Sequence, residues 1–216
     1  SILKRAILLS SFLSSLVFSE NAKAQAIKIA NVGAYSHPAL HDIDGDGDLD
    51  LFAGKEDGSI SFFRKKGTTT APDFALETET YAGIDAGEYA APFFCDIDED
   101  GKAEFFVGNR DGIILSYNNV GTAEPEWQLV ENYFKDIDVG SRSKLAFYDT
   151  DSDGDLDAIV GEYQGNLNLY ENTGRKTAPE FKLKNEILEN IDVGSRAAPF
   201  FCDFNGNGKT TLLIGR

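Results

Sequence analysis

The 216-residue sequence predicts an all-β protein built from repeated four-stranded blades, a β-propeller, with three complete blades and part of a fourth. Three observations lead to this prediction. A pattern of about 54 residues recurs, each repeat holds four short segments with strand character, and no segment of the repeats keeps a 3.6-residue helical period over three turns. The expected blades cover about residues 38–90, 91–143, 144–197 and 198–216. Propellers close with about four to eight blades, so we expect the sequence to be a fragment of a longer protein.

An acidic stretch marks each repeat. The first three read "DIDGDGDLD", "DIDEDGKAE" and "DTDSDGDLD", the fourth is "DFNGNGKTT", and their first aspartates are 54, 53 and 54 residues apart. A β-helix would need a much shorter period, and a string of β-sandwiches about 100 residues per domain. The repeat length therefore favours propeller blades.

Four strands are expected within each repeat, in chain order. A short apolar segment such as residues 92–97 leads into the acidic stretch, and a second one such as residues 104–108 leaves it. An Asp-Gly or Gln-Gly pair then predicts a hairpin turn. The third strand alternates clearly between apolar and polar residues over 166–170, and a more polar fourth strand such as residues 180–185 is expected at the outer edge.

Composition limits the class of protein. The hydrophobic fraction of 42% and the aromatic fraction of 12% are those of a globular protein. The formal net charge of −16 argues against nucleic acid or an anionic membrane surface as a partner, because both attract Lys and Arg. Cations are the natural counterpart of such a chain.

The first 24 residues have the pattern of a secretory signal peptide. Lys4 and Arg5 precede an apolar run over residues 6–18, and a small-residue pattern follows at 22–24. The run is shorter than the roughly 20 residues that a membrane span needs, although an uncleaved anchor or a buried amphipathic helix are alternatives. We therefore expect residues 25–216 to be repeat sequence and the protein to be secreted or on the cell surface, with no membrane span in the fragment.

The acidic stretches are interpreted as calcium-binding loops. Calcium takes six to eight hard oxygen ligands, which side chains at loop positions 1, 3, 5 and 9 and the backbone carbonyl of position 7 would supply. The expected ligands of the first loop are Asp42, Asp44, Asp46, Asp48 and Asp50. Those of the second loop are Asp96, Asp98, Asp100, Lys102 and Glu104, where Lys102 would offer its carbonyl and point its ammonium group to solvent. Those of the third loop are Asp149, Asp151, Asp153, Asp155 and Asp157.

Other details of the loops distinguish the kind of site. Position 6 is glycine in all four loops, as a bend with positive φ would require. The last acid stands at position 9 and a strand follows, whereas an EF-hand places a glutamate at position 12 within a helix. The fourth loop keeps Asp203 but has Asn205, Asn207 and Thr211, so we expect about three calcium ions and weak or no binding there. Solvated Asp-Gly turns and magnesium are the alternatives.

These motifs resemble a known family. The segments "DIDGDGDLDLFAG", "DTDSDGDLDAIVG" and "YENTGRKTAPEF" are similar to the FG-GAP or VCBS-type calcium-binding repeats of secreted bacterial proteins, which are related to the propeller of integrin α subunits. The resemblance implies a seven-bladed propeller with calcium in hairpin loops on one face. It also implies an extracellular role in adhesion or in binding a protein or glycan ligand.

Two classes of function compete. The first is a non-catalytic, calcium-stabilised adhesion or ligand-binding module. The second is a scaffold or appended domain of an extracellular carbohydrate-active enzyme with its catalytic part beyond the fragment. The chain has no HExxH or GxSxG motif, and its two histidines, His37 and His41, flank one expected strand, so we predict that it is not an enzyme.

A few other side chains invite a functional reading. Cys95 and Cys202 occupy the same position two blades apart, so we expect two buried free thiols and no disulfide. Trp127 aligns with Phe74 and Phe181 after the turn proline and is expected to be a packing residue rather than a platform for a sugar. Arg142 and Arg196 are expected to form salt bridges with a neighbouring acidic loop, although lining a channel or ligand groove is the alternative.

Overall fold

The computed structural model describes residues 35–68, 72–122, 124–130, 133–134, 137–185, 188, 191–204 and 206–216. The expected signal peptide lies outside these residues. Within them the chain is all-β and includes the short 3₁₀ turn η2 (Tyr81–Gly83). The strands are β1 (His37–His41), β2 (Asp50–Gly54), β3 (Ile60–Gly67), β4 (Pro72–Thr78), β5 (Ala91–Cys95), β6 (Glu104–Gly108), β7 (Ile114–Asn119), β8 (Trp127–Leu129), β9 (Lys144–Tyr148), β10 (Asp157–Gly161), β11 (Leu167–Asn172), β12 (Phe181–Asn185), β13 (Ala198–Cys202) and β14 (Thr211–Gly215).

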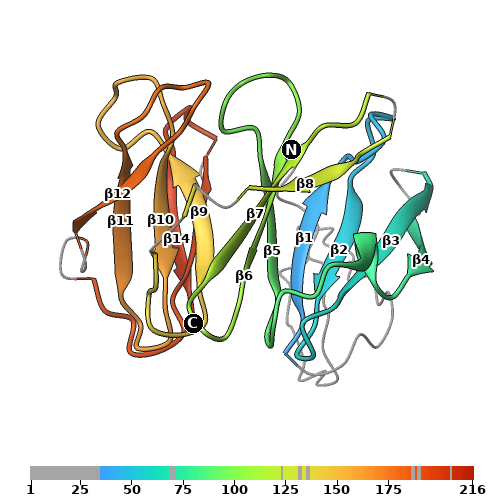
Figure 1. The fold of residues 1–216 in the computed structure, drawn as a ribbon, viewed down its shortest axis with the longest axis horizontal. Coiled ribbons are helices and arrows are strands. Elements are labelled where there is room, and N and C mark those ends of the chain that lie inside the picture. Colours follow the sequence, from blue (N-terminus) through green and yellow to red (C-terminus); the bar gives the residue numbers. More distant parts are fainter. Residues whose placement is uncertain are drawn as a thin grey trace.

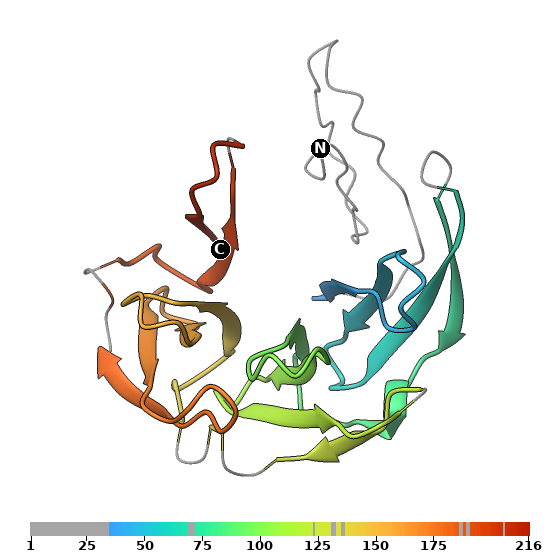
Figure 2. The ribbon, with the colours of Figure 1, turned by 90° about the horizontal axis from the view of Figure 1, so that it is seen from above.

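The strands form antiparallel sheets that follow chain order. Three sheets have four strands, β1 to β4, β5 to β8 and β9 to β12, and a two-stranded sheet pairs β13 with β14. Seen from above, the sheets lie side by side along an arc, with the first strand of each near the centre and the fourth at the periphery (Figures 1 and 2). This is the blade arrangement of a β-propeller, as predicted.

Burial within a sheet explains the strand sequences. The second strands β2, β6 and β10 are buried along their whole length, because they lie inside their own sheet and between neighbouring sheets. Their near-continuous apolar sequences meet that requirement. The outer strand β12 buries only Phe181 and exposes the next four residues, which accounts for its polar composition. Each acidic stretch connects the first strand of a sheet to the second.

A regular set of backbone hydrogen bonds joins each sheet to the next. The amide groups of Ala86 and Ala90, before β5, donate to the carbonyl oxygens of Gly58 and Lys55, in the turn between β2 and β3, at 3.1 and 3.0 Å. Equivalent bonds recur at the next two junctions. They draw the chain so close that a Cβ at Gly54, the last residue of β2, would lie 2.1 Å from the carbonyl oxygen of Ala90. The glycines that end β2, β6 and β10 are therefore required by the neighbouring blade.

Aromatic side chains fill the space between the sheets. Phe105 is fully buried, and its ring stacks on Phe94 with centroids 4.4 Å apart. The Trp127 ring lies 5.3 Å from that of Phe105, and its Nε1–H donates to the Tyr81 hydroxyl at 3.0 Å. Trp127 is partly buried and packs against the core, so the prediction that it is a packing residue is confirmed.

The two cysteines are free, as predicted, but each is only partly buried. Burial, with Glu104 and Asp96 nearby, raises the pKa of the Cys95 thiol to about 12. Within the described part of the chain, no helix has the length and apolar character needed to cross a membrane.

Candidate metal centre

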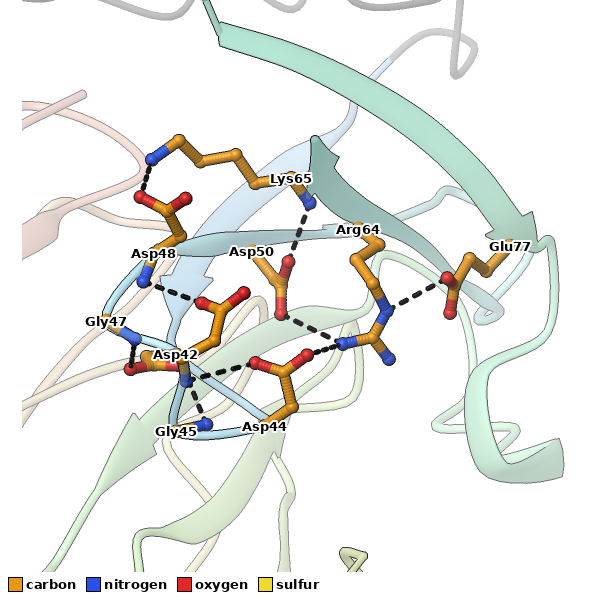
Figure 3. Close-up of polar contacts among 10 residues, drawn as sticks. Asp42, Asp44, Gly45, Gly47, Asp48, Asp50, Arg64, Lys65 and Glu77 are labelled. Atoms are coloured by element: carbon orange, nitrogen blue, oxygen red, sulfur yellow. Dashed lines mark hydrogen bonds and ion pairs between the residues drawn. The ribbon is translucent and has the colours of Figure 1, made fainter. Parts of the chain in front are cut away.

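The first acidic loop, residues 42–50, folds around the carboxylate of Asp42 (Figure 3). Asp42 Oδ1 accepts hydrogen bonds from the amides of Gly45 at 2.8 Å and Asp46 at 3.1 Å, and its Oδ2 accepts one from Gly47 at 2.8 Å. Gly47 has φ of 87°, as its loop position requires. Carboxylate oxygens of Asp42, Asp44 and Asp46 lie within 4.8 Å of one another. Three predicted ligands of this loop therefore converge.

Two basic side chains of β3 reach into the first loop. Arg64 forms an ion pair with Asp44, lies 3.7 Å from Oδ2 of Asp50, and donates from Nε to Glu77 at 2.9 Å (Figure 3). Lys65 forms an ion pair with the carboxylate of Asp48. Part of the negative charge of this loop is thus balanced from within the chain.

The second loop gathers its acids differently. Oxygens of Asp96, Asp98 and Glu104 lie within 4.8 Å of one another, whereas Asp100 is outside this group and accepts from the amide of Lys102 at 2.8 Å. No described Lys or Arg forms an ion pair with the three converging acids. Their charges are therefore not balanced by an ion pair in the described structure.

The prediction for the Lys102 side chain is wrong. Instead of pointing to solvent, its ammonium group donates to the carbonyl oxygen of Gly121 at 2.8 Å. The long side chain folds across its own blade to the turn after β7, where this carbonyl accepts it.

The third loop repeats the first with fewer counter-charges. Oxygens of Asp149, Asp151 and Asp153 lie within 4.8 Å of one another. The one described ion pair to this group comes from Lys184 on the outer strand, whose Nζ is 3.6 Å from Asp151 Oδ2. Asp157 closes the loop, and its Oδ1 accepts from the amide of Asn172 at 2.9 Å.

Comparison with known proteins identifies the repeats. The FG-GAP-like repeat family matches residues 42–107 and 149–214, which together make up more than half of the chain, and each match runs from one acidic loop through the apolar strand after the next. The chain belongs to the FG-GAP-like repeat family. A search of curated proteins found no match. A solved lectin of Agrocybe aegerita, described as recognising non-reducing terminal N-acetylglucosamine, is similar over 83% of this chain and 46% of its own, with 19% identity and a TM-score of 0.48. The chain thus spans less than half of the length of that lectin.

The acids that close the FG-GAP-like loops are buried. Asp50, Glu104 and Asp157 are at most 2% exposed. Burial, opposed by a hydrogen bond from the Ile97 amide and reinforced by neighbouring carboxylates, raises the pKa of Glu104 to about 7. Burial and the nearby carboxylates likewise raise the pKa of Asp155 to about 6. Both shifts mean that ionising Glu104 or Asp155 beside the other carboxylates of its loop is costly without a cation.

Buried carboxylate oxygens that accept no hydrogen bond from the described residues support the fit of a hard cation to the loops. One buried carboxylate oxygen in each complete loop lacks a hydrogen-bond partner among the described residues: Asp50 Oδ2, Asp96 Oδ1 and Asp155 Oδ1. Buried polar atoms without partners are rare, because each forfeits the solvation that it had in water. An all-oxygen set with several carboxylates is what Ca²⁺ prefers, so the residues present fit this ion.

The fourth loop shows which aspartate shapes the turn, as distinct from the acids that would bind an ion. Asp203 accepts from the amides of Asn207 at 3.0 Å and Gly208 at 2.7 Å, in the manner of Asp42 in the first loop. The aspartate at position 1 therefore builds the turn in every blade, whereas the other acids are not needed for it. Their presence in three loops calls for a different explanation.

Sequence reasoning missed the basic pair of the first blade. Strand register places Arg64 and Lys65 where the second blade has Asn118 and Asn119 and the third has an acid and an amide. An alignment of the repeats at these positions would have revealed the difference.

His41, Arg142 and Arg196 all pack against aromatic rings. The His41 ring stacks on Phe94 with centroids 4.7 Å apart, so it packs between blades. The expected salt bridges of Arg142 and Arg196 to an acidic loop are wrong for the described residues: Arg142 lies over Tyr89 at 4.1 Å and Arg196 approaches Tyr163 at 5.8 Å. Both arginines belong to the segments that enter the innermost strands, whereas the acidic loops follow those strands.

Proposed function

We propose that the chain is a secreted or cell-surface, non-catalytic ligand-binding module that calcium stabilises. One observation carries the proposal: three loops at equivalent positions each bring three carboxylates within 4.8 Å, and each holds one buried carboxylate oxygen that accepts no hydrogen bond from the described residues. The oxygen of the first loop, Asp50 Oδ2, lies 3.7 Å from the Arg64 guanidinium group. The fourth loop shows that the turn forms without these acids.

Calcium has a structural role in this proposal. Each loop connects the innermost strand of a blade to its fully buried second strand, so repulsion among the carboxylates acts on the core of the blade. An ion that binds the folded loops and not the unfolded chain stabilises the fold by mass action, by about 2.7 kcal/mol per site at a hundredfold excess over its dissociation constant. Extracellular calcium is in the millimolar range that suits even weak loops.

A binding role is favoured over catalysis by how the candidate acids and bases are held. Asp42 and Asp149 each accept three backbone hydrogen bonds from their own loops, so their carboxylate oxygens are already engaged in building the turn. His41 is stacked on Phe94, and burial lowers its pKa.

Calorimetry on the chelator-stripped chain, with a thermal melt in parallel, tests the proposal. We expect about three calcium ions to bind and the melting temperature to rise. Asp98→Asn should remove one ion, whereas Asp111→Asn, which removes the same charge from an exposed turn of the same blade, should leave the number unchanged. A folded chain that binds no calcium, or an Asp98→Asn variant that binds as many ions as the parent, would refute the calcium sites. Equal stabilisation by magnesium would show that the loops do not select calcium.

A further inference from the structure

A cavity lies where the innermost strands β1, β5 and β9 begin, at the opposite end of these strands from the acidic loops. Its volume is about 190 Å³. The side chains that carry the argument are Tyr35, His37, Tyr89, Arg142, Lys144 and Arg196. They come from four successive repeats, because Tyr35, Tyr89, Arg142 and Arg196 occupy the same position, two residues before the first residue of each innermost strand.

Positive charge is concentrated in this cavity. The chain has 36 acidic residues against 20 basic ones, yet Arg142, Lys144 and Arg196 form no ion pair among the described residues. Burial and the two arginines lower the pKa of Lys144. Burial, Lys144 and Arg142 lower the pKa of His37 to about 4. The three cations therefore repel one another, and an anion among them would relieve the repulsion.

Aromatic rings hold the central guanidinium group in place. Arg142 lies 4.1 Å from the ring centroid of Tyr89, 5.3 Å from that of Tyr163 and 5.8 Å from that of Tyr35. Tyr35 and Tyr89 meet edge to face at 5.4 Å. Such contacts stabilise a cation without neutralising its charge, and they leave the N–H edge of the guanidinium group able to bind an oxyanion with two hydrogen bonds.

The backbone at these positions is costly for the residues that occupy it. Tyr35, Tyr89, Arg142 and Arg196 have φ of 58°, 61°, 59° and 52°, a region where glycine would be unstrained. Hydrogen bonds to the preceding blade fix this conformation, for example from the amide of Arg142 to the carbonyl of Arg110 at 2.9 Å. Large side chains are thus present where the backbone favours glycine, and strain of this kind concentrates at functional sites.

We propose that this cavity binds the oxyanion group of an acidic sugar, a carboxylate or a sulfate, with the tyrosine rings against the sugar. The volume is below the roughly 300–1,000 Å³ of sites for drug-sized ligands, so the site takes a single headgroup. Paired N–H donors of arginine match the two oxygens of such a group. The inference rests on the proposed binding function and names the ligand class of the module.

The test is a calorimetric titration of the whole chain at saturating calcium with glucuronate, glucose 6-sulfate and neutral glucose. We expect the two acidic sugars to bind, glucose not to bind, and added salt to weaken binding. Arg196→Gln should weaken binding by about tenfold, as loss of a charge-assisted hydrogen-bond donor does. Arg175→Gln, which removes an exposed arginine on an outer turn, should bind as the parent does. Arg196 is exposed, so its variant should fold, and a thermal melt checks this.

Each outcome is informative. Tighter binding of glucuronate or of the sulfated sugar identifies the oxyanion. Indistinguishable behaviour of glucuronate and glucose, or an Arg196→Gln variant that binds like the parent, would overturn the inference. Calcium binding measured in the same preparation keeps the two proposals apart, because a chain that binds calcium and no acidic sugar refutes only this one.

Discussion

The close contact between neighbouring blades makes Gly161, the last residue of β10, a sensitive position. A Cβ there would lie 2.2 Å from the carbonyl oxygen of Ala197 and 2.9 Å from Cδ of Pro199. The first of these atoms belongs to backbone, which cannot rotate away, so the next blade would have to move by roughly 1 Å to reach ordinary contact. Gly161→Ala is therefore expected to destabilise the chain.

The magnitude follows from three contributions. Overpacking of this kind costs about 1–3 kcal/mol. The shift also strains the hydrogen bond from the Ala197 amide to the carbonyl of Glu162, 3.0 Å long, which contributes about 0.5–1.5 kcal/mol. Alanine offsets about 0.4–1 kcal/mol by restricting the unfolded chain. The expected loss of unfolding free energy is about 2 kcal/mol, or about 4–8 °C in melting temperature for a chain of this size.

Thermal and urea unfolding in saturating calcium provide the assay, and Gly215→Ala is the matched control. Gly215 ends β14 at the equivalent position, but its added Cβ would meet nothing nearer than 3.6 Å. The control should change stability by no more than about 0.5 kcal/mol. Equal effects of the two substitutions would show that the blade contact is not what requires glycine at these positions.

Three further predictions concern the core, the first loop and the cavity. Phe105→Ala removes a fully buried ring between the first two blades and should cost about 3–5 kcal/mol in urea unfolding. Arg64→Asn removes a cation that is paired with the first loop, and a unit charge at this range is worth more than ~1 kcal/mol. The substitution should therefore raise the calcium affinity of the first loop by about tenfold. A calcium titration followed through the amide resonance of Gly47 measures this affinity. His37 should titrate near pH 4 by NMR, because burial and the facing Lys144 and Arg142 depress the pKa of its ring. The folded pKa of His37 is below its ordinary value of 6.5, so its contribution to stability is present above about pH 6.5 and is lost as the pH falls toward 4.

Controls and opposite outcomes are available for each. Leu129→Ala, at a side chain 50% exposed in the same sheet, should have little effect, and a comparable loss would contradict the role given to Phe105. An unchanged affinity of the first loop in Arg64→Asn would mean that the guanidinium group does not compete with the ion. A His37 midpoint between pH 6 and 7, assigned with a His37→Gln variant, would show that the ring is neither desolvated nor close to the cavity cations.

Local patterns in the sequence determined the fold class and the acidic loops. Strand period, turn glycines and the repeat are properties of short segments, and a nine-residue loop between two strands positions its own side chains through its own backbone. The convergence of Asp42, Asp44 and Asp46 and the positive φ of Gly47 could therefore be anticipated from spacing alone. The two free cysteines followed from the same register argument.

Only the tertiary structure decided which long side chains meet and why certain residues are where they are. Arg64 reaches Asp44 across 20 positions of sequence, and Lys102 finds the carbonyl of Gly121 rather than solvent. The sequence also did not show that Arg142 packs with cations and tyrosines of other blades instead of pairing with an acidic loop. Such partnerships depend on strand register and on the contact between blades, since a side chain with many rotatable bonds takes the partner that the assembled fold brings within its reach. The sequence by itself determined the blades and their acidic loops, and the packing of one blade against the next decided the rest.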